Sequence, residues 1–124
     1  MTRRVLVIDD EPHMSRLYAR LLRPHADAVV TTGGVREAWA AIQDAEGDFH
    51  AILCDLNMPH LSGVDFFEGL PERAPHLQKR VIFLTGGVFD DETQQFLDSM
   101  ANPLIEKPFD IDELVALVKT VADQ

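Results

Sequence analysis

The 124-residue chain is 46% hydrophobic and 26% charged, a length and composition that fit one globular domain over residues 1–124. No apolar run approaches the roughly 20 residues of a membrane-spanning helix, and the start MTRRVLVIDDEPH is unlike a signal peptide, so we expect a cytoplasmic protein without direct membrane contact. The formal net charge of −10 argues against direct binding of nucleic acid, because phosphate contacts need clustered lysine and arginine.

Short apolar runs alternate with segments of helical spacing along the whole chain. The runs predict strands at residues 5–8, 28–30, 51–54, 81–84 and 104–105. The segments that follow them predict helices at residues 14–22, 35–42, 64–70, 92–100 and 111–121. Because strands buried on both faces are continuous apolar runs, this order predicts an α/β fold, a doubly wound five-stranded parallel sheet flanked by five helices.

Proline, glycine and aspartate support several of these boundaries. Pro12 suits the first turn of a helix. Gly33 and Gly34 separate the second strand from its helix. Asp110, with Glu113 three residues later, predicts a cap for the last helix.

Three aspartates lie where two of the predicted strands end. Asp9 and Asp10 close the run VLVIDD, and Asp55 closes AILCD. Since parallel strands share one carboxyl edge, the three carboxylates should meet there, at the edge where open α/β sheets bind ligands. Their mutual repulsion is relieved by a hard divalent cation or by a raised pKa. A cation held there suits phosphoryl chemistry, with Asp55 as the group that receives the phosphoryl.

Two further side chains follow strands at the same edge. Thr85 ends VIFLT and can donate its hydroxyl to a phosphoryl oxygen, although a plain ST-turn is the alternative. Lys107 follows the fifth run and can neutralise an anion, although a solvated lysine is the alternative. Their convergence with the aspartates favours a common site.

The motifs VLVIDDEP, CDLNMPHLSGVDFF, FLTGG and EKPFD, in this order and spacing, resemble the receiver domains of two-component response regulators. The resemblance covers essentially the whole chain and implies the flavodoxin-like receiver fold. It implies that Asp10, Asp55 and the backbone carbonyl of Asn57 bind Mg²⁺ directly, and that Asp9 acts through a bound water.

The resemblance also implies a function for the phosphoryl-facing residues. Asp55 would be the phosphoacceptor, Thr85 and Lys107 would contact the phosphoryl group, and the Lys107–Pro108 peptide would be cis. The phosphoryl group would come from a histidine kinase or a histidine phosphotransfer domain. The chain would then be a signalling domain in a phosphorelay rather than an enzyme, promoting only its own phosphorylation and dephosphorylation.

Partners and readout are implied less completely. The resemblance implies a downstream effector, and it allows a homodimer through the fourth helix, fifth strand and fifth helix. The segment FLTGGVFDDETQQFLDSMANPLIEKPFD is most similar to receivers of hybrid sensor histidine kinases. Many receivers carry Tyr or Phe three residues before the lysine, but here Leu104 stands there, so an aromatic rotamer switch is not expected.

Two alternative functions remain at this point. An aspartate-nucleophile phosphohydrolase of the haloacid-dehalogenase type also places an aspartate after a strand, but it needs a second aspartate where this chain has Asn57. A degenerate receiver that only docks partners is suggested by Leu104, although the acceptor residues are complete.

Two conspicuous residues are expected to be structural. Trp39 lies on the apolar side of the predicted helix at 35–42 and should be a partly buried packing residue. Cys54 lies in an apolar strand, where a buried and inert thiol is usual.

Overall fold

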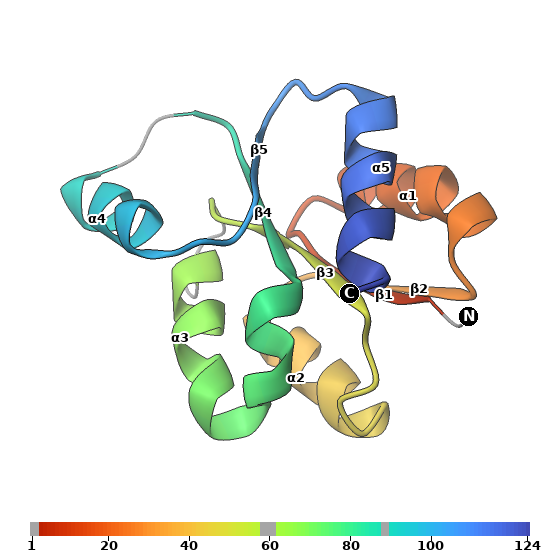
Figure 1. Cartoon of the computed structure of the whole chain (residues 1–124), viewed down its shortest axis with the longest axis horizontal. Helices are drawn as coiled ribbons and strands as arrows, with labels where there is room; N and C mark the ends of the chain where they lie inside the picture. The colour runs from red at the N-terminus through yellow and green to blue at the C-terminus, as the bar shows by residue number, and fades with distance from the viewer. Residues whose placement is uncertain (1–2, 58–61, 88–89) are drawn as a thin grey trace.

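Five parallel strands form the centre of the molecule (Figure 1). The structure is a computed structural model that describes residues 3–57, 62–87 and 90–124, so residues 58–61 of the motif CDLNMPHLSGVDFF lie outside the described residues. The strands are β1 (Arg4–Ile8), β2 (Ala28–Thr32), β3 (Ala51–Asp55), β4 (Val81–Thr85) and β5 (Leu104–Glu106). Their order is β2-β1-β3-β4-β5, and every neighbouring pair is parallel. The predicted doubly wound sheet is confirmed, with strands one or two residues longer than expected.

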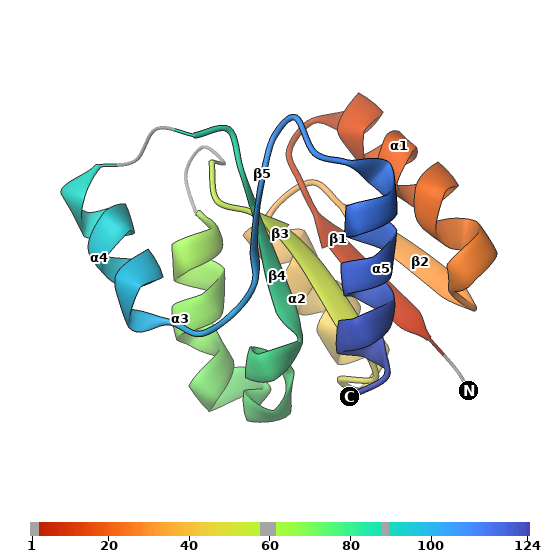
Figure 2. The same cartoon turned by 45° about the horizontal axis from the view of Figure 1, so that its top comes forward.

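Helices cover both faces of this sheet (Figures 1 and 2). They are α1 (Pro12–Leu22), α2 (Val35–Asp44), α3 (Gly63–Arg73), α4 (Asp91–Ser99) and α5 (Ile111–Ala122), with short 3₁₀ turns at Arg23–His25 and Pro75–Arg80. Helices α1 and α5 lie together on one face, and α2 and α3 lie on the other, with α4 beyond α3. None of the helices in the described part of the chain has the length and apolar character that crossing a bilayer requires.

The helix ends follow local sequence rules, and two side-chain caps, Ser62 at α3 and Asp90 at α4, were not predicted. Pro12 occupies the first turn of α1, and the Asp110 side chain accepts hydrogen bonds from the first backbone N–H groups of α5, as expected. The capping box with a reciprocal pair of bonds instead starts α3, between Ser62 and Asp65. Aspartate in place of the usual glutamate at the third position hid this signal.

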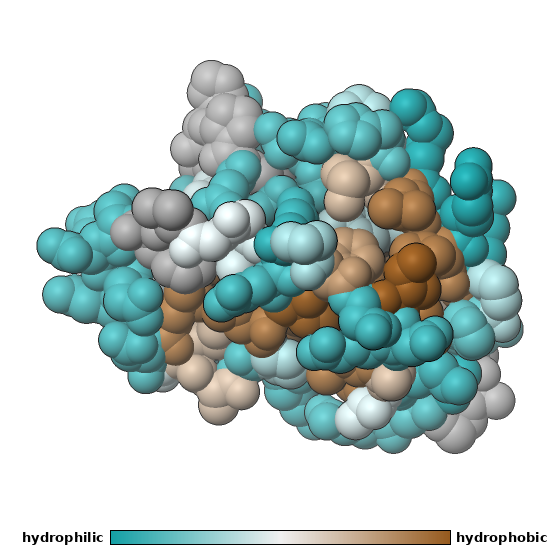
Figure 3. Space-filling view, turned by 90° about the horizontal axis from the view of Figure 1, so that it is seen from above, coloured by the Kyte–Doolittle hydropathy of each residue, from teal (hydrophilic) through white to brown (hydrophobic). Residues whose placement is uncertain are grey.

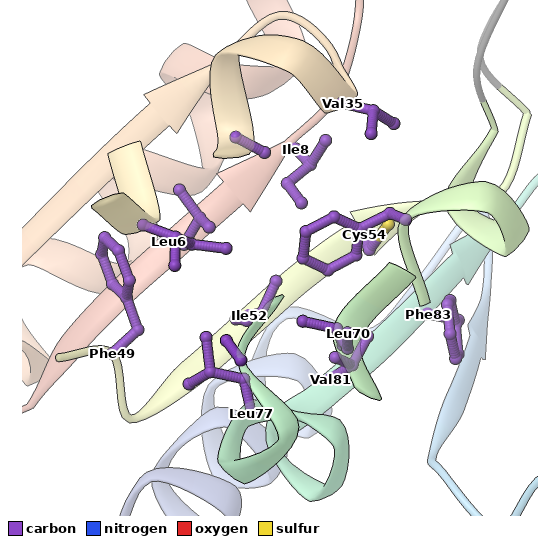
Figure 4. Close-up of a cluster of buried hydrophobic side chains, with 14 of the residues drawn as sticks. Leu6, Ile8, Val35, Phe49, Ile52, Cys54, Leu70, Leu77, Val81 and Phe83 are labelled. Carbon is purple, nitrogen blue, oxygen red and sulfur yellow. The ribbon is translucent and has the colours of Figure 1, made fainter. Parts of the chain in front are cut away.

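Side chains alternate along each strand, so the sheet has two separate apolar cores. We call the face under α1 and α5 the α1/α5 face and the opposite one the α2/α3 face. On β1, Val5 and Val7 are buried against α1 and α5, whereas Leu6 and Ile8 are buried against α2 and α3 (Figure 4). Because every second side chain points to the same face, the position of a residue along its strand determines which face its side chain shares at the strand end.

The α2/α3 face is packed with aromatic rings. The centroids of the Trp39 and Phe66 rings lie 4.7 Å apart. A Cβ atom added to Gly69 would come within 2.9 Å of an atom of the Trp39 ring. Glycine at 69 thus lets α2 and α3 approach closely. Trp39 is partly buried and Cys54 fully buried, as predicted, and burial raises the pKa of the Cys54 thiol.

Candidate functional site

Asp9, Asp10 and Asp55 meet at the carboxyl edge of β1 and β3, which are neighbours in the sheet. One carboxylate oxygen from each lies within 4.8 Å of the others. Asp9 and Asp55 are 1% and 4% exposed, whereas Asp10 is exposed. Asp9 and Asp55 are buried because they continue the side-chain alternation of β1 and β3 onto the α1/α5 face, whereas Asp10 follows two residues after the end of β1.

Backbone N–H groups fix one oxygen of each buried aspartate. The Glu11 N–H donates to Asp9 Oδ1 at 2.9 Å, and the Asn57 N–H donates to Asp55 Oδ1 at 2.8 Å. Each aspartate therefore accepts a bond from the residue two positions later, in an Asx-turn at the end of its strand. The other oxygen of each, Oδ2, is left facing the site.

Lys107 lies directly opposite these two free oxygens. Its Nζ is 3.2 Å from Asp55 Oδ2 and 3.7 Å from Asp9 Oδ2. The Lys107 backbone N–H donates to the Thr85 carbonyl, which extends the β4–β5 pairing by one residue, and the Lys107–Pro108 peptide is cis, as expected. One ammonium thus serves two buried carboxylates and hydrogen-bonds only the nearer one.

The surroundings of Asp9 disfavour its charged form. Burial raises the pKa of Asp9, and the Asp55 and Asp10 charges raise it further, against the lowering effects of the Glu11 N–H and of Lys107. Asp9 Oδ2 has no hydrogen-bond partner among the described residues. A cluster of oxygen ligands with excess negative charge and an unpaired carboxylate oxygen fits a hard divalent cation such as Mg²⁺.

Thr85 lies at the end of the neighbouring strand β4 and is fully buried. Its Oγ1 accepts from the Gly87 N–H at 3.2 Å and from the Asn57 side-chain amide at 3.4 Å. The bond to Gly87 is the ST-turn that was the alternative for this residue. It leaves the hydroxyl proton free for another acceptor, so the turn and a site role are compatible.

Sequence reasoning missed one group at this site and one buried hydroxyl in the core under α1 and α5. The Asn57 side chain links the loop after β3 to Thr85, whereas the expected metal site used only the backbone carbonyl of this residue. Tyr18 on α1 is fully buried, and its hydroxyl has no partner among the described residues. The apolar helical spacing around Tyr18 gave no signal that its position differs from that of its leucine neighbours.

The assembled groups have a clear chemical capability. The site offers a buried carboxylate as nucleophile, oxygen ligands for a divalent cation, an ammonium group and a hydroxyl donor. Phosphoryl transfer depends on such positioning and charge neutralisation rather than on further covalent chemistry by the protein.

Comparisons with known proteins point in the same direction. A family model described as the response regulator receiver domain matches residues 5–119. The transcriptional regulatory protein TcrA of Mycobacterium tuberculosis is 32% identical over 119 residues, covering 96% of this chain and 46% of that protein. The solved structure of the chemotaxis protein CheY4 of Vibrio cholerae is similar with a TM-score of 0.82 and 25% identity, covering 98% of this chain and 99% of that one.

A sensor protein is also among the relatives. The sensor protein TorS of Escherichia coli is 28% identical over 105 residues, covering 85% of this chain and 11% of that protein. This similarity lends partial support to the expected likeness to receivers of hybrid kinases. The chain spans about half the length of the first curated relatives it matches.

Proposed function

The chain belongs to the response regulator receiver domain family of two-component systems, and from that premise we propose that Asp55 is its phosphoacceptor. The donor would be the phosphohistidine of a histidine kinase or a histidine phosphotransfer domain. One observation carries the proposal: a buried carboxylate lies 3.2 Å from the Lys107 ammonium and within 4.8 Å of the Asp9 and Asp10 oxygens.

The metal ligands are assigned as part of the same proposal. Asp10, Asp55 and the backbone carbonyl of Asn57 would hold Mg²⁺ directly, and Asp9 would hold it through a bound water. When bound, the cation neutralises charge on the phosphoryl oxygens. The Asn57 carbonyl suits this role because the N–H of the same residue already anchors Asp55 Oδ1.

Asp55, Lys107 and Thr85 each have a separate role in the transfer step. A carboxylate oxygen of Asp55 forms the new P–O bond as the P–N bond of phosphohistidine breaks, and the electron pair of that bond returns to the imidazole. Lys107 neutralises charge on the phosphoryl group, which it can reach because it already lies against Asp55. Thr85 turns its free hydroxyl proton toward a phosphoryl oxygen, and this turn begins the conformational signal.

The direct test is substitution of the acceptor. Asp55→Asn should abolish the acid-labile mass increase of one phosphoryl group that acetyl phosphate and Mg²⁺ produce in the wild type. Asp44→Asn, an exposed change at the end of α2, is the matched control and should label fully. Full labelling of Asp55→Asn would refute the assignment.

The labelling experiment, together with a phosphatase assay, separates the alternative functions. A wild-type chain that takes no label would make constitutive docking the better account. Rapid turnover of a generic phosphatase substrate would revive the phosphohydrolase, which Asn57 and the family membership disfavour. Under our proposal the chain promotes only its own phosphorylation and dephosphorylation.

Partner contacts follow from the family and from exposed apolar residues. We propose that an effector, or a second copy of the chain, binds the surface of α4, β5 and α5, in the cytoplasm. Leu104 on β5 and Ile111 on α5 are large apolar residues that are 36% and 50% exposed. Figure 3 shows hydrophobic residues gathered in a band between hydrophilic flanks on the face seen from above.

A further inference from the structure

A pocket lies between α2 and the end of α3, which run side by side on the α2/α3 face (Figures 1 and 2). Its volume is about 630 Å³, within the range of pockets that bind small molecules. The phosphoacceptor site uses none of the residues that line it. Four lining residues of α2 are spaced three or four apart and so share one face of the helix, namely Arg36, Trp39, Ala40 and Gln43.

Trp39 forms a firmly held wall of this pocket. Its ring packs on Phe66, with centroids 4.7 Å apart, and lies so close to α3 that only glycine fits at position 69. The guanidinium carbon of Arg73, in the last turn of α3, lies 4.6 Å from the Trp39 ring centroid. Side chains that are already held in place lose little conformational freedom when a ligand binds, so this wall is preorganised.

The loop after α2 closes one end of the pocket through a contact with His76. The His76 Nε2 donates to the Gly47 carbonyl at 2.9 Å, since a carbonyl can only accept. Gly47 has a φ of +74°, and a Cβ atom there would come within 2.9 Å of the His76 ring. Glycine at this position therefore lets the ring reach the carbonyl and join the two segments that line the pocket.

The charged side chains of the pocket favour an anionic ligand. Arg36 and Arg73 are exposed, and neither forms an ion pair with another residue in the described part of the chain. Glu46 also lines the pocket, so two permanent cations stand there against one carboxylate. The chain as a whole carries a formal charge of −10, and its overall field repels anions. An anion that binds here must therefore be recognised by these local groups.

We propose that this pocket binds a planar aromatic anion, a small molecule that joins an aryl ring to a carboxylate or phosphate group. The Arg73 guanidinium, held over Trp39, is a planar cation on which the aryl ring stacks. Arg36, one turn before Trp39 on the same face of α2, pairs with the anionic group. An aliphatic anion makes only the second contact and a neutral arene only the first. The concave shape, with an apolar wall and cationic groups, favours a small molecule over a flat protein surface.

The first experiment tests the ligand class on the intact chain. Trp39 is the sole tryptophan, so its indole N–H gives one signal in ¹H–¹⁵N spectra. Titration with 2-naphthoate or with 1-naphthyl phosphate should shift this signal saturably, and the tighter of the two identifies the preferred anionic group. Neutral 2-naphthamide and aliphatic cyclohexanecarboxylate should each bind about tenfold more weakly, the loss of one charge-assisted or stacking contact. No saturable shift with either naphthyl anion would overturn the proposal. A response to tetraglutamate alone would also overturn it and would indicate a contact site for acidic protein segments.

The second experiment tests the two arginines. Arg36→Gln should weaken 2-naphthoate binding about tenfold, whereas Arg36→Lys keeps the charge and most of the affinity. Arg73→Lys keeps the charge but removes the planar group, and it should weaken binding about threefold or more. The control Arg20→Gln on α1 changes the net charge equally on the opposite face of the sheet and should have no effect.

Two results would contradict the roles of these arginines. They are unchanged affinity in both Arg36→Gln and Arg73→Lys, and an equal loss in the control Arg20→Gln. The acceptor variant Asp55→Asn should bind 2-naphthoate as the wild type does, because Asp55 does not line the pocket. Failure of the phosphoacceptor assignment would therefore leave this inference standing, and the reverse also holds.

Discussion

The two faces of the sheet are built from the same strands but differ in chemistry. On the α2/α3 face the strands support a buried apolar layer on which the rings of Phe66 and Trp39 pack together. On the α1/α5 face the apolar rows end in Asp9 and Asp55, with Lys107 opposite. Both unpaired buried polar atoms in the described part of the chain belong to this second face. The comparison teaches that one alternating pattern can place the stabilising packing on one side of a sheet and the costly charges on the other.

The largest expected effect breaks the packing on the α2/α3 face. Phe66→Ala should lower the free energy of unfolding by about 3–5 kcal/mol, because it leaves a cavity under Trp39. The Mg²⁺ affinity of the folded protein should not change. Urea unfolding and Mg²⁺ titration measure the two quantities. Phe66→Leu, which fills more of the cavity, should lose less stability and keeps the comparison measurable if Phe66→Ala does not fold.

A change on the charged face should give the reverse result. Asp9→Asn should weaken Mg²⁺ binding by about 10- to 100-fold, the usual loss when a group that orients a metal site is removed. The free energy of unfolding without Mg²⁺ should not fall, since a buried charge in an unfavourable position is removed. Calorimetric titration with Mg²⁺ measures the affinity. Unchanged affinity would place Asp9 outside the metal site.

The pH dependence of stability sharpens this contrast. The pKa of Asp9 is raised in the folded state, chiefly by burial, so the folded protein binds this proton more tightly than the unfolded chain does. Its contribution to stability is therefore greatest below about pH 4, the pKa of an unfolded aspartate, and is lost as the pH rises through the higher folded value. With a metal chelator present, the free energy of unfolding of Asp9→Asn should exceed that of the wild type by an amount that grows as the pH rises from 4 to 7. Parallel urea-unfolding curves for the two proteins across this range would contradict the expectation.

The smallest effect is expected at the sheet edge. Leu104 is 36% exposed on β5, so Leu104→Ser should change the free energy of unfolding by no more than about 0.5 kcal/mol. Labelling of Asp55 by acetyl phosphate should be unaffected. Loss of a binding partner in Leu104→Ser, with both of these values preserved, would identify the residue as part of a contact surface.

The sequence predicted most of the fold because buried strands and amphipathic helices carry strong periodic signals. It also predicted that Asp9, Asp10, Asp55, Thr85 and Lys107 would share one edge, since each directly ends or follows a strand. In a parallel sheet, the points in the sequence where the strands end are enough to identify the residues at that edge.

Contacts that depend on three-dimensional packing could not be predicted in the same way. Sharing of Lys107 between Asp9 and Asp55 depends on side-chain distances that differ by half an ångström. The burial of Tyr18 in the α1/α5 core depends on how α1 packs on the sheet, and its apolar neighbours in sequence gave no sign of a buried hydroxyl there.

The placement of Tyr18 and Trp39 has an optical consequence. They are the sole tyrosine and the sole tryptophan, and the sheet separates them, with Tyr18 in the α1/α5 core and Trp39 packed on the α2/α3 core. Near-ultraviolet signals from the two chromophores therefore come from opposite layers. Tryptophan emission should follow loosening of the α2/α3 layer during unfolding, while tyrosine absorption should follow loosening of the α1/α5 core. A single unmodified sample can thus show whether one layer of the molecule changes before the other.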